Sequence, residues 1–156
     1  MTVYQEEKEG AFRSILFACN HNAVRSVMAE GIAKYFLGSK VQVESCGVHA
    51  GEINPFMISA MEEIGIDVSG HKPRRFSELE DEDAHYDVII SLTPEAQHQA
   101  VEFTRNSDVR IPYWPTHDPT LAQGNRTQIM EAFRDVRDHL SDKIQAFFQA
   151  MPPPNA

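Results

Sequence analysis

The stretch that decides the fold runs from residue 14 to residue 26 and reads SILFACNHNAVRS. Residues 14–18 form a short apolar run that ends at Cys19, which is typical of a buried strand. From about Ser26 the apolar residues recur at helical spacing until Gly38, which provides a C-terminal stop. The pattern therefore predicts a strand and a helix that are joined by a loop.

The same alternation of strands and helices continues along the rest of the chain. Further strands are predicted over residues 41–45, 87–92 and 109–113, and further helices over residues 54–65, 94–104 and 126–150. This spacing predicts the α/β class, as a three-layer sandwich in which about four parallel strands carry helices on both faces. Ligands bind at the carboxyl ends of the strands in such folds, so the loop after the first strand is the expected site.

Length and composition fit a single domain. The chain has 156 residues, of which 42% are apolar and 24% are charged, so it can bury a core without disulfides or a structural metal. We expect a flexible N-terminal arm over residues 1–13, a packed domain over residues 14–150 and a C-terminal tail over residues 151–156.

The net charge of -9 excludes some classes of partner. Nucleic acid and anionic membranes would be repelled, so neither is expected as a partner. The sequence shows neither a secretory signal nor an apolar stretch of membrane-spanning length, which predicts a cytoplasmic protein. In a reducing compartment the two cysteines, Cys19 and Cys46, point to thiol chemistry rather than to a structural disulfide.

The loop over residues 19–26 places a thiol and a guanidinium where a helix begins. Backbone N–H groups and the helix dipole converge there, so an oxyanion would fit above the loop. The helix N-terminus, Arg25 and Ser26 all favour the thiolate of Cys19, which is the useful nucleophile. Arg25 can also offer a planar fork of donors to two oxygens of a tetrahedral anion. The alternative is structural, with Cys19 a small buried hydrophobic residue and Arg25 a surface residue of the first helical turn.

The Cys-x5-Arg-Ser pattern at residues 19–26 resembles the phosphate-binding loop of the low-molecular-weight protein tyrosine phosphatase superfamily. Asn22 matches the loop asparagine of that family, Ser45 matches the end of its second strand, and Asp118 with Pro119 matches its late Asp-Pro. The stretches over residues 53–69 and 118–138 are more similar to the branch that contains the thioredoxin-coupled arsenate reductases.

The resemblance implies a role for each matching residue. Cys19 would attack phosphorus, and Asp118 would protonate the leaving oxygen and later activate the water that hydrolyses phosphocysteine. Arg25 would hold the phosphate oxygens together with the loop, and Ser45 would support the loop. The remaining phosphate-binding residues would be Asn20, His21, Asn22, Ala23, Val24 and Ser26. No metal and no organic cofactor is implied. From its local sequence alone, Asp118 could instead be only the cap of a turn or of a helix.

Several residues depart from the family pattern. His21 stands where the family usually has glycine, Val24 where many members have a second cysteine, and Thr120 where an aromatic residue often follows Asp-Pro. The arsenate reductases of this branch use two further cysteines near the third strand, and residues 91–100 contain neither. Cys46 could resolve or protect Cys19, or it could be a buried core residue.

Three functions are compatible with these residues. The first is a cysteine-dependent phosphatase that hydrolyses phosphate monoesters of the phosphotyrosine type, in a phosphorylated protein or a small molecule. The second is an arsenate reductase that uses an external thiol such as glutathione. The third is a noncatalytic module that binds phosphate or a phosphoprotein. Phosphate and arsenate are the expected oxyanion ligands in all three.

The remaining charged residues give weaker signals. The seven histidines show no spacing typical of metal ligands, so no metal site is expected. His117, next to Asp118, is expected to tune its neighbour. The basic run of Lys72, Arg74 and Arg75 is interpreted as a solvated face, or as a patch that guides an anionic substrate.

Overall fold

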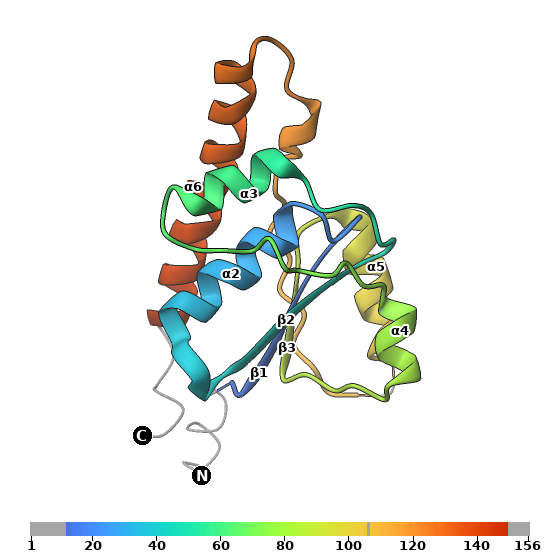
Figure 1. Ribbon diagram of the computed structural model, residues 1–156. Coiled ribbons are helices and arrows are strands. Elements are labelled where there is room, and N and C mark those ends of the chain that lie inside the picture. The colour runs from blue at the N-terminus through green and yellow to red at the C-terminus, as the bar shows by residue number, and fades with distance from the viewer. Residues whose placement is uncertain (1–11, 106, 150–156) are drawn as a thin grey trace.

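The computed structural model describes residues 12–105 and 107–149 (Figure 1). Nearly all the predicted elements are confirmed to within a few residues. The elements in chain order are β1 (Ser14–Cys19), α2 (Arg25–Leu37), η1 (Gly38–Lys40), β2 (Gln42–Gly47), α3 (Pro55–Glu62), α4 (Phe76–Asp81), β3 (Val88–Ser91), α5 (Pro94–Phe103), η2 (Pro119–Leu121) and α6 (Arg126–Gln149). Helix α4 was not predicted, because its only buried side chains, Phe76 and Leu79, are too few to reveal a period.

The sheet is parallel, with the strand order β2-β1-β3. Four strands were predicted, and the described residues form three. The fourth predicted strand, residues 109–113, is reduced to isolated bridges that pair Arg110 with Val88 and Tyr113 with Ser91. Pro112 lies between the two bridges and has no N–H to donate, so this edge segment cannot continue a regular ladder.

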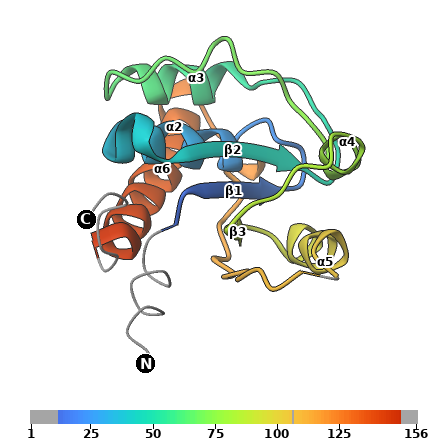
Figure 2. The ribbon, with the colours of Figure 1, turned by 90° about the horizontal axis from the view of Figure 1, so that it is seen from below.

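Alternate residues of β1 face different helical layers. Ile15, Phe17 and Cys19 pack in the larger hydrophobic cluster with α2, α3 and α6. Leu16 and Ala18 pack in a second cluster with α4 and α5. In Figure 2, α2 and α6 lie on one side of the strands and α4 and α5 on the other. The predicted three-layer α/β sandwich is therefore confirmed.

The ends of the chain are only partly described. Residues 1–11 of the predicted arm and the whole predicted tail lie outside the described residues. Phe12 is 6% exposed and packs in the larger cluster. The next N–H group, of Arg13, donates to Asp87 at 2.7 Å, so the packing of the domain already includes these two residues. No helix in the described ranges is both long and apolar enough to cross a membrane.

Candidate active site

The loop over residues 19–26 is held by its carbonyl groups. Four N–H groups of the segment that follows β2, residues 48–54, donate to the carbonyls of Cys19, Asn20, His21 and Ala23 at 2.7–3.3 Å. In the described part of the chain, the N–H groups of residues 21–24 donate to no protein acceptor. Because residues 48–54 bind the loop carbonyls, the N–H groups of residues 21–24 and the N-terminus of α2 are available to an anion.

Asn22 gives the loop its shape. Its backbone adopts the left-handed conformation, with φ of 52°, which asparagine tolerates better than most residues. Its side chain is fully buried, and its amide nitrogen donates to Ser26 at 2.8 Å and to Ser45 at 2.9 Å. Its amide oxygen accepts from the His71 ring and from the Arg74 N–H, both at 2.9 Å. All four hydrogen-bonding positions of the amide are therefore used.

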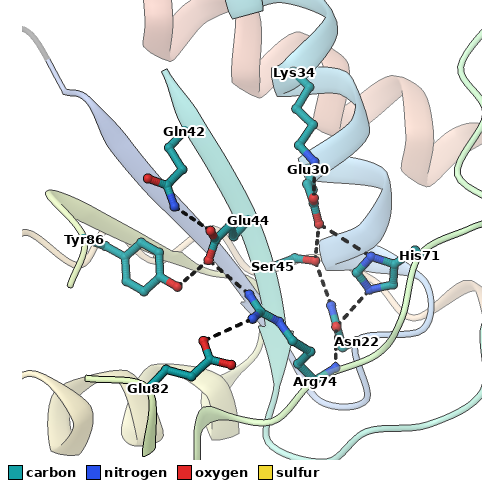
Figure 3. A network of polar contacts seen from close by, with 10 residues as sticks. All are labelled: Asn22, Glu30, Lys34, Gln42, Glu44, Ser45, His71, Arg74, Glu82 and Tyr86. Atoms are coloured by element: carbon teal, nitrogen blue, oxygen red, sulfur yellow. Dashed lines mark hydrogen bonds and ion pairs between the residues drawn. The ribbon is translucent and has the colours of Figure 1, made fainter. Parts of the chain in front are cut away.

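A second row of polar groups stands behind Asn22 (Figure 3). The Ser45 hydroxyl donates to Glu30 at 2.5 Å, and Lys34 pairs with the other oxygen of that carboxylate at 2.6 Å. The second nitrogen of His71 lies 3.7 Å from Glu30. Burial lowers the pKa of His71 although Glu30 opposes the shift, so the neutral ring is favoured, with its proton on the nitrogen that faces Asn22.

The Arg74 side chain is held by two carboxylates. Its guanidinium pairs with Glu44 at 3.0 Å and with Glu82 at 3.5 Å, and the Tyr86 hydroxyl also donates to Glu44 (Figure 3). Burial acts to raise the pKa of Glu44, but the hydrogen bonds from Tyr86, Gln42 and Arg74 outweigh it and hold that pKa below its ordinary value. Arg74 does not line the cavity over residues 19–26, and its charge is shared with the carboxylates of Glu44 and Glu82, which bind its guanidinium.

A cavity of about 220 Å³ opens above the loop. It is lined by Cys19, His21, Ala23, Val24, Arg25, Gly51, Glu52, Asn54, Asp118 and Thr120. A larger cavity, of about 550 Å³, lies between α2 and residues 65–71 and touches neither cysteine. The smaller one is the candidate site because it brings together the nucleophile, the guanidinium and the carboxylate that the sequence singled out.

The other predicted loop residues lie around this cavity without lining it. The Asn20 side chain accepts a hydrogen bond at 2.7 Å from Thr93, the N-cap of α5. Ser26 and Ser45 hold Asn22, as described above. Ser26 also lies 3.0 Å from the Cys19 sulfur, where its hydroxyl can donate to a thiolate. Cys19 itself is 2% exposed and sits at the N-terminal end of α2.

Arg25 and Asp118 face each other across the cavity. Arg25 is 8% exposed, and its Nη1 donates to the Thr116 carbonyl at 2.9 Å. Its Nη2 lies 3.8 Å from Oδ2 of Asp118. Oδ1 of Asp118 accepts from the N–H and the hydroxyl of Thr120 at 3.0 and 2.7 Å. Asp118 therefore caps η2 with one oxygen and directs the other toward the site. The alternative prediction, that Asp118 caps a turn or a helix, is thus also correct.

The pKa of Asp118 is lowered by its neighbours. Partial burial acts to raise it, but the two hydrogen bonds from Thr120 and the charge of Arg25 outweigh burial. His117 adds a smaller effect in the same direction, as expected for a residue that tunes its neighbour. Asp118 is therefore ionised at neutral pH while the site is empty.

Cys46 lies on the wrong face of the sheet to resolve Cys19. It pairs in register with Ala18 and packs in the cluster of α4 and α5, whereas Cys19 packs with α2. Its side chain is fully buried, and burial raises the pKa of its thiol well above the ordinary value. The two thiols cannot meet without unpairing β1 from β2, so the resolving role considered for Cys46 is wrong and the core role is the one that the structure gives it.

A pair of substitutions at Asn22 separates its backbone role from its side-chain role. Asn22→Gly keeps the left-handed conformation without strain, and Asn22→Ala does not. We expect both variants to lose stability, because the partners of the buried amide are left unpaired. The alanine variant should be less stable than the glycine variant by about 1 kcal/mol. Urea unfolding measures both differences, and equal stabilities for the two variants would contradict the strain argument.

Comparisons with known proteins agree with this geometry. A profile described as "Low molecular weight phosphotyrosine protein phosphatase" matches residues 14–153. The arsenate reductase of Bacillus subtilis is 33% identical over 135 residues, which cover 85% of this chain and 93% of that protein.

Two solved structures have similar folds. The tyrosine phosphatase amsI of Erwinia amylovora aligns with a TM-score of 0.73 at 18% identity, over 90% of this chain and 93% of that one. An arsenate reductase in the phosphate binding state aligns with a TM-score of 0.67 at 31% identity, over 90% of this chain and 99% of that one. The fold, the loop over residues 19–26 and the sequence match lead to one conclusion: the chain belongs to the low molecular weight phosphotyrosine protein phosphatase family.

Proposed function

We propose that this protein is a cysteine-dependent phosphatase that hydrolyses phosphate monoesters through a phosphocysteine intermediate. The observation that carries the proposal is the meeting of Cys19, Arg25 and Asp118 in one cavity, with the free N–H groups of the loop beside them. Nucleophile, anion clamp and proton donor are the three parts that transfer of a phosphoryl group to a thiol requires.

The first half of the reaction forms the S–P bond. A phosphate ester enters with its oxygens on the loop N–H groups and on Arg25, whose charge is then shared with the substrate. Asp118 loses part of the interaction that held its pKa down, and it faces the negative phosphate, so its protonated form is favoured. The Cys19 thiolate attacks phosphorus, the P–O bond to the leaving group breaks, and the leaving oxygen takes the proton of Asp118.

The second half regenerates the thiolate. Asp118, now a carboxylate, accepts a proton from a water molecule, and the water oxygen attacks phosphorus as the S–P bond breaks. Inorganic phosphate leaves and Asp118 holds the proton again. The loop N–H groups and Arg25 contact the phosphoryl oxygens throughout, where they stabilise the charge that develops in both transition states. Every group that these steps need belongs to this chain.

The substrate is a phosphorylated protein or a small phosphomonoester. Of the cavity-lining side chains only His21 carries a ring, and that ring stacks on His49 with 5.7 Å between centroids. The phenyl ring of phosphotyrosine could therefore pack against one imidazole in this cavity, and against no Phe, Tyr or Trp side chain. This lining gives aryl esters little advantage over alkyl esters beyond the intrinsic quality of the leaving group.

A second candidate function is arsenate reduction with an external thiol, which the arsenate reductase relatives favour. Cys19 would attack As(V) and displace a hydroxide that Asp118 protonates to water. An external thiolate would then attack the Cys19 sulfur, so that arsenic leaves as arsenite with the S–As electron pair and a mixed disulfide remains. A second external thiol would reduce that disulfide, since Cys46 is out of reach.

One experiment separates the two candidates. Release of phosphate from para-nitrophenyl phosphate is measured from about pH 5 to about pH 8 without metal, and arsenite formation is measured in parallel with glutathione present. We expect metal-independent hydrolysis that needs no thiol. A protein that hydrolyses no ester but forms arsenite would overturn the phosphatase proposal, and one that binds phosphate without either reaction would be a binding module.

The acid role of Asp118 predicts the result of Asp118→Asn. We expect kcat/KM, which reports the half of the reaction that forms the S–P bond, to fall by roughly 10² to 10³, because an amide cannot protonate the leaving oxygen. The fall should be greater for alkyl phosphates, whose leaving groups need the proton more than nitrophenolate does. Steady-state kinetics on both substrates check this, with Asp142→Asn on the exposed face of α6 as the matched control. Equal losses of kcat/KM on both substrates would contradict a general acid.

A further inference from the structure

The two oxygens of Asp118 have different surroundings. Oδ1 accepts two hydrogen bonds, from the N–H of Thr120 at 3.0 Å and from its hydroxyl at 2.7 Å. Oδ2 is turned toward Arg25, with 3.8 Å between Oδ2 and Nη2. Thr120 also lines the cavity itself, so its hydroxyl acts at the site and not behind it.

We propose that Thr120 is a positioning residue for Asp118: by engaging Oδ1 with two donors, it makes Oδ2 the oxygen that carries and delivers the catalytic proton. This inference rests on the proposed function, and it adds which oxygen acts and which neighbour selects it. A proton on Oδ1 would have to displace the Thr120 hydroxyl or N–H, whereas a proton on Oδ2 leaves both hydrogen bonds in place. The carboxyl group therefore holds its proton on the side of the bound ester.

Which oxygen of Asp118 carries the proton depends on the residue type at position 120. The N–H of any residue except proline can supply the first hydrogen bond, but the second needs a side-chain hydroxyl two residues after the aspartate. Serine can replace threonine in this contact, and valine, which has nearly the same shape, cannot. The chain thus offers an isosteric variant that removes one hydrogen bond and a conservative variant that keeps it.

Other charged groups near Asp118 are the same in all these variants. Arg25 faces Asp118 from α2, and His117 precedes it in the chain. Cys19, His21 and Glu52 line the same cavity. On the side of α6, Asp135 and His139 line a neighbouring cavity together with His117. A change that follows the hydroxyl at position 120 is therefore assigned to that hydroxyl.

The sign of the expected effect follows from the hydrogen bond. A donor to a carboxylate stabilises the charged form, so the Thr120 hydroxyl helps to lower the pKa of Asp118. Its removal raises that pKa, and Asp118 stays protonated to higher pH. The first half of the reaction needs protonated Asp118 in the complex with the ester, so the alkaline limb of the pH profile of that half, measured at saturating ester, moves upward.

The test compares Thr120→Val and Thr120→Ser with the native protein. We expect the alkaline limb of the single-turnover rate of nitrophenol release, measured at saturating para-nitrophenyl phosphate, to move up by roughly half a unit to one unit in the valine variant, and to return to the native position in the serine variant. The carboxyl carbon of Asp118, followed by NMR titration, should show the same order of pKa values without any turnover. Urea unfolding checks that both variants are folded.

Two failures can be told apart. If the native protein hydrolyses the ester and the valine variant leaves both the limb and the NMR titration unmoved, the role of Thr120 is overturned and the phosphatase stands. If the native protein hydrolyses no ester, the proposed function fails, and the NMR titration alone still decides whether the hydroxyl acts on Asp118. A serine variant that behaves like valine would assign any shift to the threonine methyl group and would also overturn the proposal.

Discussion

Cys19→Ser is expected to abolish ester hydrolysis, with a loss of roughly 10⁴-fold or more, while phosphate binding is retained. A serine hydroxyl is not ionised at neutral pH, and the hydrogen-bond partner of the Cys19 side chain is another hydroxyl, that of Ser26 at 3.0 Å. Among the described residues no base is hydrogen-bonded to the side chain at position 19 to activate the serine, and Asp118 is needed in its protonated form at this step. The loop N–H groups and Arg25 are unchanged by the substitution, so the anion site itself remains.

Two measurements check this expectation. Steady-state hydrolysis of para-nitrophenyl phosphate gives the loss of activity, and calorimetric titration with inorganic phosphate gives the affinity. Cys46→Ala is the matched control, because Cys46 is fully buried on the opposite face of the sheet, and we expect its activity to stay within about twofold of native. Turnover that survives in Cys19→Ser would refute the covalent mechanism.

Arg25→Lys is expected to reduce kcat/KM by roughly 10² to 10³. One nitrogen of the guanidinium is already used, since Nη1 donates to the Thr116 carbonyl at 2.9 Å. Because the guanidinium has several N–H donors in one plane, Arg25 can keep its hydrogen bond to the Thr116 carbonyl and still donate to two phosphoryl oxygens. A lysine ammonium has one nitrogen, which cannot hold the carbonyl and span the phosphate together.

Kinetics and binding together identify the origin of this loss. Because Arg25 contacts the anion in both the ground state and the transition state, we expect weaker phosphate binding and a lower kcat in the same variant. Arg105→Lys, on the exposed surface beyond α5, is the control for the change of residue type. A normal kcat with only a raised KM would mean that Arg25 stabilises the ground state and the transition state equally.

The sequence predicted most reliably those features that depend on residues close together in the chain. Cys19 and Arg25 are six residues apart on one loop, and the helix predicted to start at residue 54 does start there, where Asn54 accepts hydrogen bonds from the N–H groups of Phe56 and Met57. Asp118 could be assigned to the site only from the strand order, which puts it after the fourth predicted strand at the same sheet edge as Cys19, and from the family resemblance, because no local pattern says which loops of an α/β fold converge. The number of strands was too high by one because the apolar residues around Pro112 have the composition of a strand but form only isolated bridges to β3 instead of a regular ladder.

The partners that shape the loop could not be predicted, because they are distant in the chain. His71 contacts Asn22 across 49 residues, and the Thr116 carbonyl contacts Arg25 across 91 residues. His71 was one histidine among seven, with no spacing that set it apart. Arg74 was grouped with a solvated basic run, and its backbone N–H turned out to matter to the loop more than its charge. Such contacts depend on how the loops pack at the carboxyl edge of the sheet.

The placement of the two thiols on opposite faces of the sheet decides how this protein meets oxidants. A peroxide that converts Cys19 to the sulfenic acid leaves it with no neighbouring thiol to condense with. Its rescue then depends on small thiols that can enter the cavity, and in their absence oxidation proceeds to the sulfinic acid, which does not return. The lifetime of the active protein under oxidative stress is thus set by the thiol pool around it and not by its own second cysteine.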